Sequence, residues 1–122
     1  MILVDTSVWV EHFRDTERAA GLGDLLDGNE VLLHPWVLRE LVLGGLGKSS
    51  ESVIADLRRL PEAVRVADDE VMELIRSRRL SCKAIDWVDA QLLASALVSG
   101  SELWTFDGGL ARVARGLGIA TH

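Results

Sequence analysis

The sequence has one cysteine, Cys82, two prolines and no tyrosine among its 122 residues. A single thiol excludes an internal disulfide and is typical of a reducing compartment, so we expect an intracellular, cytoplasmic protein. Residues 1–5 lack a basic region and reach an acid at once, which is not the pattern of a secretory signal. No run of about 18 apolar residues occurs, so the sequence predicts no membrane-spanning helix.

Basic residues are also scarce. Lys and Arg number 13 against 19 Asp and Glu, which gives a formal net charge of −6 at pH 7. This balance excludes a protein that coats nucleic acid through a generic basic surface, but it allows an acidic metal site that acts on nucleic acid. Hydrophobic residues make up 48% of the chain, which indicates a folded protein, and the length predicts a single domain over residues 1–122.

Short apolar runs alternate with longer helical segments along the chain. Strands are expected at 2–4, 31–33, 63–66 and 103–105, with a short edge strand at 119–120. Helices are expected at 6–14, 17–26, 35–43, from Ser49 or Ser50 to about 60, 68–79, 86–98 and 108–117, with Gly44 and Gly45 ending the third of these and Gly100 the sixth. This alternation predicts an α/β fold, and the apolar strands are typical of a buried parallel sheet.

Two acids follow predicted strands, where the ligands of such sheets bind. Asp5 lies between two apolar runs, and Asp107 follows the strand at 103–105 after Thr105. Both acids also suit an ordinary role as the N-cap of the following helix.

Two further acids lie on predicted helices. Glu40 is on a helix that is apolar in almost every direction, so we expect burial on most sides and a carboxylate that needs a partner or a metal. A polar stripe shared with Arg39 is the alternative. Asp89 is in the first turn of the helix that Asp86 caps, and these two acids share a face; favourable placement in the helix dipole is the alternative for Asp89.

These four acids together predict a metal site. Carboxylates that lie close together raise each other's pKa, and a divalent cation removes that cost. Oxygen ligands favour Mg²⁺ or Mn²⁺ over zinc, and the histidines at 12, 34 and 122 have no metal-ligand spacing. His34, which precedes Pro35, is expected to be structural or peripheral.

In this order and context the four acids resemble the motifs of PIN-domain ribonucleases, and most closely those of VapC-type toxins. The matching segments are 3–7, 37–41, 89–94 and 103–107. The resemblance implies a three-layer α/β/α sandwich with a short, mainly parallel sheet of four to five strands. It also implies a metal-dependent endoribonuclease that cuts tRNA or ribosomal RNA, acts as the toxin of a type II toxin–antitoxin system, binds a cognate antitoxin and forms a homodimer.

The resemblance assigns roles to individual residues. The expected catalytic and metal-binding residues are Asp5, Glu40, Asp89 and Asp107, and the expected supporting residues are Thr6, Ser7, Thr105 and Asp86. Asp86 could replace or assist Asp89 as the third ligand. One or two Mg²⁺ or Mn²⁺ ions would lower the pKa of a water and make it a nucleophile near neutral pH.

Basic and apolar side chains supply weaker candidates for binding. The expected RNA contacts are Arg76, Arg78, Arg79 and Lys83, followed by Arg14, Lys48, Arg112 and Arg115. Solvated surface is their alternative, and buried packing is favoured over base stacking for the four tryptophans. Six apolar residues of the early segments could form a groove for an antitoxin helix or belong to the core: Val8, Val10, Phe13, Leu22, Leu25 and Leu26.

Two other classes stay open. One is a catalytically silent PIN-like module that only binds RNA or protein. The other is a receiver-type signalling domain, which usually has paired acids after its first strand and a lysine after its last. Here Asp5 stands alone, and residues 119–121 include no lysine.

Overall fold

The computed structural model describes residues 1–44, 46 and 50–122. Its elements are β1 (Ile2–Val4), α1 (Thr6–Phe13), the 3₁₀ helix η1 (Glu17–Ala19), α2 (Leu22–Asp27), β2 (Val31–Leu32), α3 (Pro35–Gly44), α4 (Ser50–Leu57), α5 (Asp68–Ser77), the 3₁₀ helix η3 (Leu80–Cys82), α6 (Trp87–Ser99), β3 (Glu102–Trp104) and α7 (Gly108–Gly116). The expected boundary residues Gly45 and Ser49, and the RNA candidate Lys48, lie outside the described residues.

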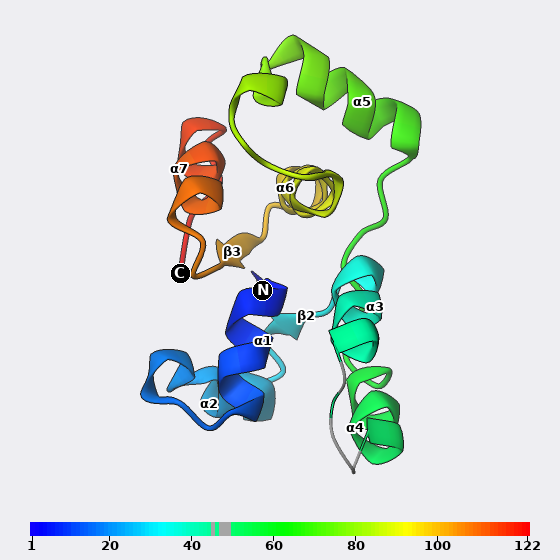
Figure 1. Cartoon of the computed structure of the whole chain (residues 1–122), viewed down its shortest axis with the longest axis vertical. Coiled ribbons are helices and arrows are strands. Elements are labelled where there is room, and N and C mark those ends of the chain that lie inside the picture. Colours follow the sequence, from blue (N-terminus) through cyan, green and yellow to red (C-terminus); the bar gives the residue numbers. More distant parts are fainter. Residues whose placement is uncertain (45, 47–49) are drawn as a thin grey trace.

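The sheet is parallel, and its first strand is central. In the described chain it has three strands in the order β2-β1-β3, with helices packed around it (Figure 1). All residues of β1 are buried although successive side chains point to opposite faces, so both faces of the sheet are covered. The prediction of an α/β fold with buried parallel strands is confirmed.

The sheet is shorter than the predicted four to five strands. In place of a strand at 63–66, a single parallel bridge joins Leu33 to Glu62, and another joins Leu103 to Thr121 in place of the strand at 119–120. Val64 is 41% exposed, so the first of these segments leaves the sheet at its edge with a side chain in solvent. A parallel strand in such a sheet is covered on both faces, whereas the side chain of Val64 lies partly in solvent.

Two helix boundaries depend on glycine, one at Gly21 that was not predicted and one at Gly100 that was. Gly21 has a φ of 96° and divides the predicted helix 17–26 into η1 and α2. Gly100 has a φ of 67° and forms the C-cap of α6, as predicted. Both conformations lie in the left-handed region, which glycine enters without steric cost.

The helix α5 packs against α6, on the side of α6 that faces away from β3 (Figure 1).

The helix α3 is less buried than its sequence predicted. Val37 and Leu41 are buried, but Trp36, Val42 and Leu43 are 37%, 48% and 90% exposed. The expectation of burial on most sides was wrong, because one face of α3 packs on the domain while another carries apolar side chains into solvent. None of the helices in the described part of the chain is long and apolar enough to cross a membrane.

His34 is the buried N-terminal cap of α3. Its Nδ1 accepts a hydrogen bond from the backbone N–H of Trp36 at 3.1 Å, and its carbonyl accepts one from Leu38 at 3.1 Å. The side chain is 2% exposed. Burial, together with the charge of Arg65, lowers the pKa of His34 to about 4, although Glu62 acts in the opposite direction.

We expect His34→Asn to reduce the loss of stability on acidification. The pKa of His34 falls from 6.5 to about 4 on folding, so the unfolded chain binds more protons between these pH values. The free energy of unfolding therefore decreases as pH falls through this window, by on the order of 2 kcal/mol at pH 4.5. Asn keeps a side-chain oxygen for the cap and does not titrate.

Urea unfolding at pH 7 and pH 4.5 measures this contribution. The difference in unfolding free energy between the two pH values should be smaller in His34→Asn than in the wild type. The control is His122→Asn, which removes an exposed imidazole. A pH dependence in His34→Asn equal to that of the wild type would contradict the assignment.

Candidate active site at the carboxyl edge of the sheet

The ends of β1 and β3 bring Asp5 and Thr105 into contact. The N–H of Asp5 donates to the carbonyl of Trp104 at 2.9 Å, which continues the parallel ladder by one residue. The hydroxyl of Thr105 donates to Oδ2 of Asp5 at 2.6 Å. Neighbouring parallel strands end at the same edge of a sheet, which is why residues far apart in the sequence meet here.

Asp5 is a buried carboxylate that hydroxyl and amide groups hold in place. Its exposed fraction is 7%, its Oδ1 accepts from the N–H of Thr6 at 2.8 Å, and its Oδ2 accepts from the Ser7 hydroxyl at 2.8 Å. Asp5 is therefore the N-cap of α1, as the alternative interpretation of the sequence proposed. The cap role accounts for one of its hydrogen bonds, and the contacts with Ser7 and Thr105 are additional.

Glu40 reaches the same edge from α3, which packs against α1. The Thr6 hydroxyl donates to Oε1 of Glu40 at 2.6 Å, so Thr6 contacts Glu40 through its side chain and Asp5 through its backbone. Arg39 does not share this position, because its guanidinium lies 5.2 Å from the ring centroid of Trp36. Glu40 therefore contacts the edge of the sheet through Thr6, whereas Arg39 contacts Trp36 on its own helix.

Asp86 and Asp89 form a reciprocal capping box at the start of α6. Oδ1 of Asp86 accepts from the N–H of Asp89 at 2.8 Å, and Oδ2 of Asp89 accepts from the N–H of Asp86 at 3.1 Å. Burial raises the pKa of Asp89 to about 6; the bond from the Asp86 N–H opposes this, and the charges of Asp86, Asp5 and Asp107 add to it. The charges of the two strand-end acids, Asp5 and Asp107, thus act on Asp89, which is half-buried, whereas the side chain of Asp86 is exposed to solvent.

Asp107 and Ser7 complete the hydrogen-bonded edge. The N–H of Asp107 donates to the Thr105 hydroxyl at 3.0 Å, and its Oδ1 accepts from Gly109 at 2.9 Å as the N-cap of α7. The N–H of Phe106 donates to the Ser7 hydroxyl at 3.0 Å. Hydroxyl groups therefore connect Asp5 with the backbone of Asp107, and Thr6 connects Asp5 with Glu40, whereas the hydrogen bonds of Asp89 in the described chain are with Asp86.

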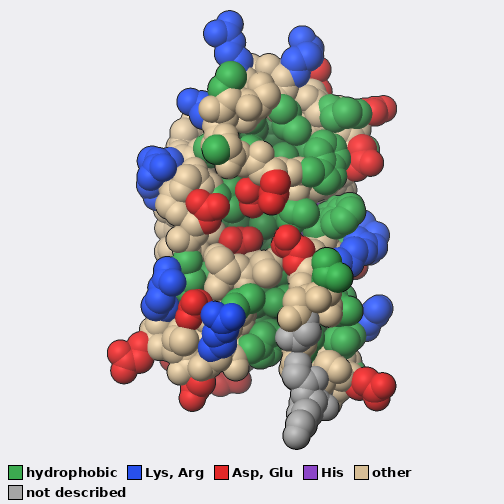
Figure 2. Space-filling model, viewed as in Figure 1, with side chains coloured by type: hydrophobic (Ala, Val, Ile, Leu, Met, Phe, Trp, Pro, Cys, Tyr) green, Lys and Arg blue, Asp and Glu red, His purple; other side chains and the backbone are tan. Residues whose placement is uncertain are grey.

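This edge is anionic, and no basic side chain of the described residues is paired with its acids. Acidic side chains gather at the centre of the face in Figure 2, between α1, α3, α6 and β3. The ion pairs of the described residues involve Glu11, Glu62 and Glu73, and none of the candidate ligands. Within the same residues, no three carboxylate, imidazole or thiol groups stand close enough to hold a metal ion by themselves.

The donor chemistry suits a small, hard cation despite that spacing. Mg²⁺ keeps several waters and binds proteins through one or two carboxylates, so it does not need a cage of protein ligands. A buried carboxylate with like charges around it and no basic partner in the described chain is stabilised by such an ion. The residues present fit a hydrated divalent cation.

The basic residues that were candidates for RNA contacts lie in three different surroundings. Arg76 is bound to Glu73 at 2.8 Å, whereas Arg78 and Lys83 line a cavity beside α7. Arg79 is exposed in a left-handed conformation next to η3. Arg18, which no sequence pattern singled out, has its guanidinium 4.4 Å from the ring centroid of Phe106, beside the acidic edge. Only the fold brings it there.

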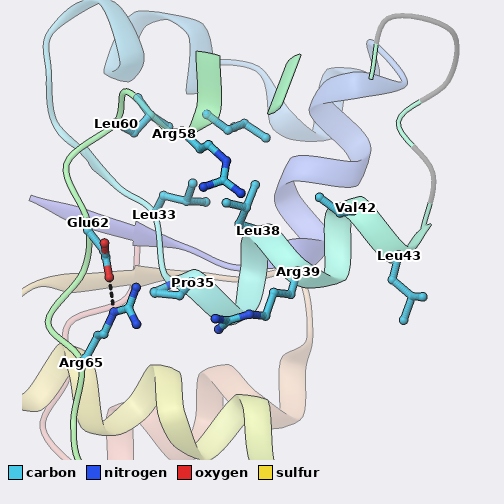
Figure 3. Close-up of a pocket in the computed structure, with 11 residues that line it drawn as sticks. Leu33, Pro35, Leu38, Arg39, Val42, Leu43, Arg58, Leu60, Glu62 and Arg65 are labelled. Atoms are coloured by element: carbon cyan, nitrogen blue, oxygen red, sulfur yellow. Dashed lines mark hydrogen bonds and ion pairs between the residues drawn. The ribbon is translucent and has the colours of Figure 1, made fainter. Parts of the chain in front are cut away.

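Two apolar grooves lie on other surfaces of the molecule. One, of about 640 Å³, is bounded by α3, α4 and the segment 60–65, and the ion pair between Glu62 and Arg65 lies on its wall (Figure 3). The other, of about 230 Å³, includes Phe13 and Leu26 among its lining residues. Phe13 and Leu26 belong to the residues considered for an antitoxin groove, whereas Val8 and Leu22 of the same set are core residues.

Comparisons with known proteins agree in the family that they indicate. The PIN domain family matches residues 2–116. The chain is 44% identical over 121 residues to proteins named ribonuclease VapC32 from two Mycobacterium tuberculosis strains, covering 98% of this chain and 95% of each relative. A crystal structure of FitAcB from Neisseria gonorrhoeae superposes with a TM-score of 0.70 and 26% identity, covering 99% of this chain and 96% of that one.

Proposed function

The chain belongs to the PIN domain family, and from this membership we propose that it is a metal-dependent endoribonuclease, the toxin of a toxin–antitoxin pair. One observation carries the proposal on the structural side. The buried carboxylate of Asp5 is fixed by three donors at the edge where Glu40, Asp89 and Asp107 also stand, and none of these acids is neutralised by a basic residue of the described chain.

The hydrogen bonds of Asp5 indicate which oxygen faces a cation. Each carboxylate oxygen has two lone pairs. Oδ2 accepts from the hydroxyls of Ser7 and Thr105 and is saturated, whereas Oδ1 accepts only from the N–H of Thr6 among the described residues. We therefore propose Oδ1 as the metal-binding atom, with Glu40, Asp89 and Asp107 as the other acids that hold Mg²⁺ or Mn²⁺, directly or through water.

The chain's own residues supply orientation and charge in this mechanism. A bound divalent ion lowers the pKa of water and offsets charge on the phosphate. Thr105 and Ser7 fix the plane of the Asp5 carboxylate, and Thr6 fixes Glu40 relative to it. Because these donors are already in place, little reorganisation is needed when the phosphate arrives.

The proposal includes two partners. One is an antitoxin protein, for which the exposed apolar side chains of Trp36, Val42 and Leu43 provide a surface of the expected kind. The other is an RNA of the tRNA or ribosomal class, cut in the cytoplasm. A homodimer is also part of the proposal, and the same apolar surface on α3 is available to a second copy.

Cleavage of RNA in the presence of a chosen metal tests this function. We expect the purified protein to cut tRNA or ribosomal RNA with Mg²⁺ or Mn²⁺, to stop when EDTA is added, and to resume when the metal is restored in excess. Gel analysis of end-labelled RNA detects the products. A protein that binds RNA but leaves a broad panel of tRNA, ribosomal RNA and mRNA intact under all these conditions would instead be a silent binding module.

A further inference from the structure

A cavity of about 600 Å³ lies between the segment 78–84 and α7. Three cationic side chains line it, Arg78, Lys83 and Arg112, and no carboxylate of the described residues does. The remaining lining residues are apolar or small. The volume lies in the range of ligand-binding pockets, roughly 300–1,000 Å³.

The positive charge of this cavity is not neutralised by ion pairs within the described part of the chain. The protein has a net charge of −6. The ion pairs of the described residues use Arg18, Arg65 and Arg76, and none of the three cavity cations. Concentrated cationic side chains on an acidic protein select anions by long-range attraction and by direct contact.

The cavity adjoins the acidic edge on both of its walls. Gly109 lines the cavity, and its N–H donates to Oδ1 of Asp107 at 2.9 Å. Ala84, which also lines it, is followed after one residue by the capping box of Asp86 and Asp89. An acidic edge that suits a cation is therefore contiguous with a basic cavity that suits phosphate.

The side chain of Arg112 lies near this junction. The guanidinium nitrogens of Arg112 lie 3.6 Å and 3.9 Å from the positions that Cβ atoms on Gly108 and Gly109 would occupy. The arginine therefore lies along the first turn of α7, next to Asp107. Among the described residues, no aromatic side chain lines the cavity, which favours contacts with a sugar-phosphate backbone over base stacking.

We propose that the cavity lined by Arg78, Lys83 and Arg112 binds the phosphates of the RNA strand next to the phosphate that is cut. The inference rests on the proposed ribonuclease function and extends it to a sequence-independent substrate subsite. These three residues position the strand, and the chemistry stays with the acids. Their loss should therefore raise KM and leave kcat at saturating RNA nearly unchanged.

Binding of a fluorescein-labelled single-stranded RNA in EDTA, where no cleavage occurs, tests the subsite. The variant is Lys83→Gln with Arg112→Gln, and the matched control is Arg58→Gln with Arg59→Gln, two exposed arginines outside the cavity whose substitution removes the same charge. The slope of log K against log salt should fall by about 1.4 in the cavity variant, since each single-strand phosphate contact contributes about 0.7. Affinity at about 0.1 M salt should weaken roughly ten-fold or more, and the control should change far less.

Cys82 gives an independent measure of location. It lines the cavity, is exposed and is the sole cysteine of the chain. Bound RNA should slow its reaction with a thiol reagent in the wild type and in the control pair, but not in the cavity variant. Thermal unfolding confirms that the variants are folded, because substitutions at exposed sites change stability by about 0.5 kcal/mol or less.

The outcomes separate this inference from the proposed function. Equal loss of affinity in the two double variants, or a Cys82 that RNA does not protect, would overturn the subsite while RNA cleavage by the wild type still stands. A hexa-aspartate peptide that protects Cys82 as well as RNA does would reassign the cavity to an acidic polypeptide. A wild type that neither binds nor cuts RNA would overturn both proposals.

Discussion

Asp5→Asn should reduce RNA cleavage by at least about a hundred-fold, beyond what loss of an outer partner of a metal site costs. The substitution removes the negative charge of the most buried acid at the edge, which is 7% exposed. An amide binds a divalent cation much more weakly than a carboxylate does. The effect should appear in kcat, because the ion acts on the reacting groups and not on remote parts of the RNA.

The same substitution should leave the fold intact. Asn is as good an N-cap as Asp, so its oxygen can still accept from the N–H of Thr6. The hydroxyls of Ser7 and Thr105, which now donate to Oδ2, can rotate and accept from the new amide. We expect a loss of about 1 kcal/mol in the free energy of unfolding, or less.

Cleavage assays and thermal unfolding of the same preparation separate these effects. The matched control is Asp15→Asn, which removes an equal charge from an exposed site with a φ of 55°, a conformation that Asn tolerates well. The control should retain wild-type activity. Undiminished cleavage by Asp5→Asn would remove Asp5 from the metal site.

The sequence predicted the central part of this arrangement because strand ends and chemistry coincide there. Asp5 and Thr105 follow short apolar strands, and the parallel rule places such residues at one edge. Their observed hydrogen bond of 2.6 Å agrees with that reasoning. The N-cap role of Asp86 was predictable for a similar reason, since capping depends on a few neighbouring residues.

Other features depend on what packs against a segment, which local patterns do not report. The apolar pattern of α3 is the same whether its residues face the core or an external partner, so the exposure of Leu43 could not be foreseen. Residues 63–66 have strand-like composition, but Val64 is exposed to solvent. The position of Arg18 over Phe106 and the cavity between 78–84 and α7 arise only from the tertiary fold.

The identity of the third acid leads to the second large expected effect. Asp89→Asn should reduce cleavage by about a hundred-fold or more, whereas Asp86→Asn should retain most activity. Asp89 is half-buried, and burial raises its pKa to about 6; the charges of Asp86, Asp5 and Asp107 add to this rise, so the negative charges of the strand-end acids act on Asp89. Asp86 is exposed, and Asn preserves its hydrogen bond to the N–H of Asp89.

At Asp89, stability should respond in the opposite sense to activity. Asp89 has a pKa of about 6 in the folded protein against its ordinary value of 3.8, so above pH 3.8 its ionisation disfavours the folded state. Asn removes that cost, which after solvent screening and the loss of a helix-dipole interaction is on the order of 1 kcal/mol or less. In EDTA at pH 7, Asp89→Asn should therefore unfold at the wild-type temperature or above it.

Paired measurements of RNA cleavage and thermal unfolding on the two variants decide the assignment. An inactive Asp89→Asn protein of unchanged or higher stability cannot owe its inactivity to misfolding, so the carboxylate charge itself must be what the reaction requires. If instead only Asp86→Asn is inactive, the third ligand is Asp86, and Asp89 serves the capping box alone. Because Asp86 caps α6 and Asp89 lies in its first turn, the contrast between them separates the effect of charge at the acidic edge from that of the structure of the helix start.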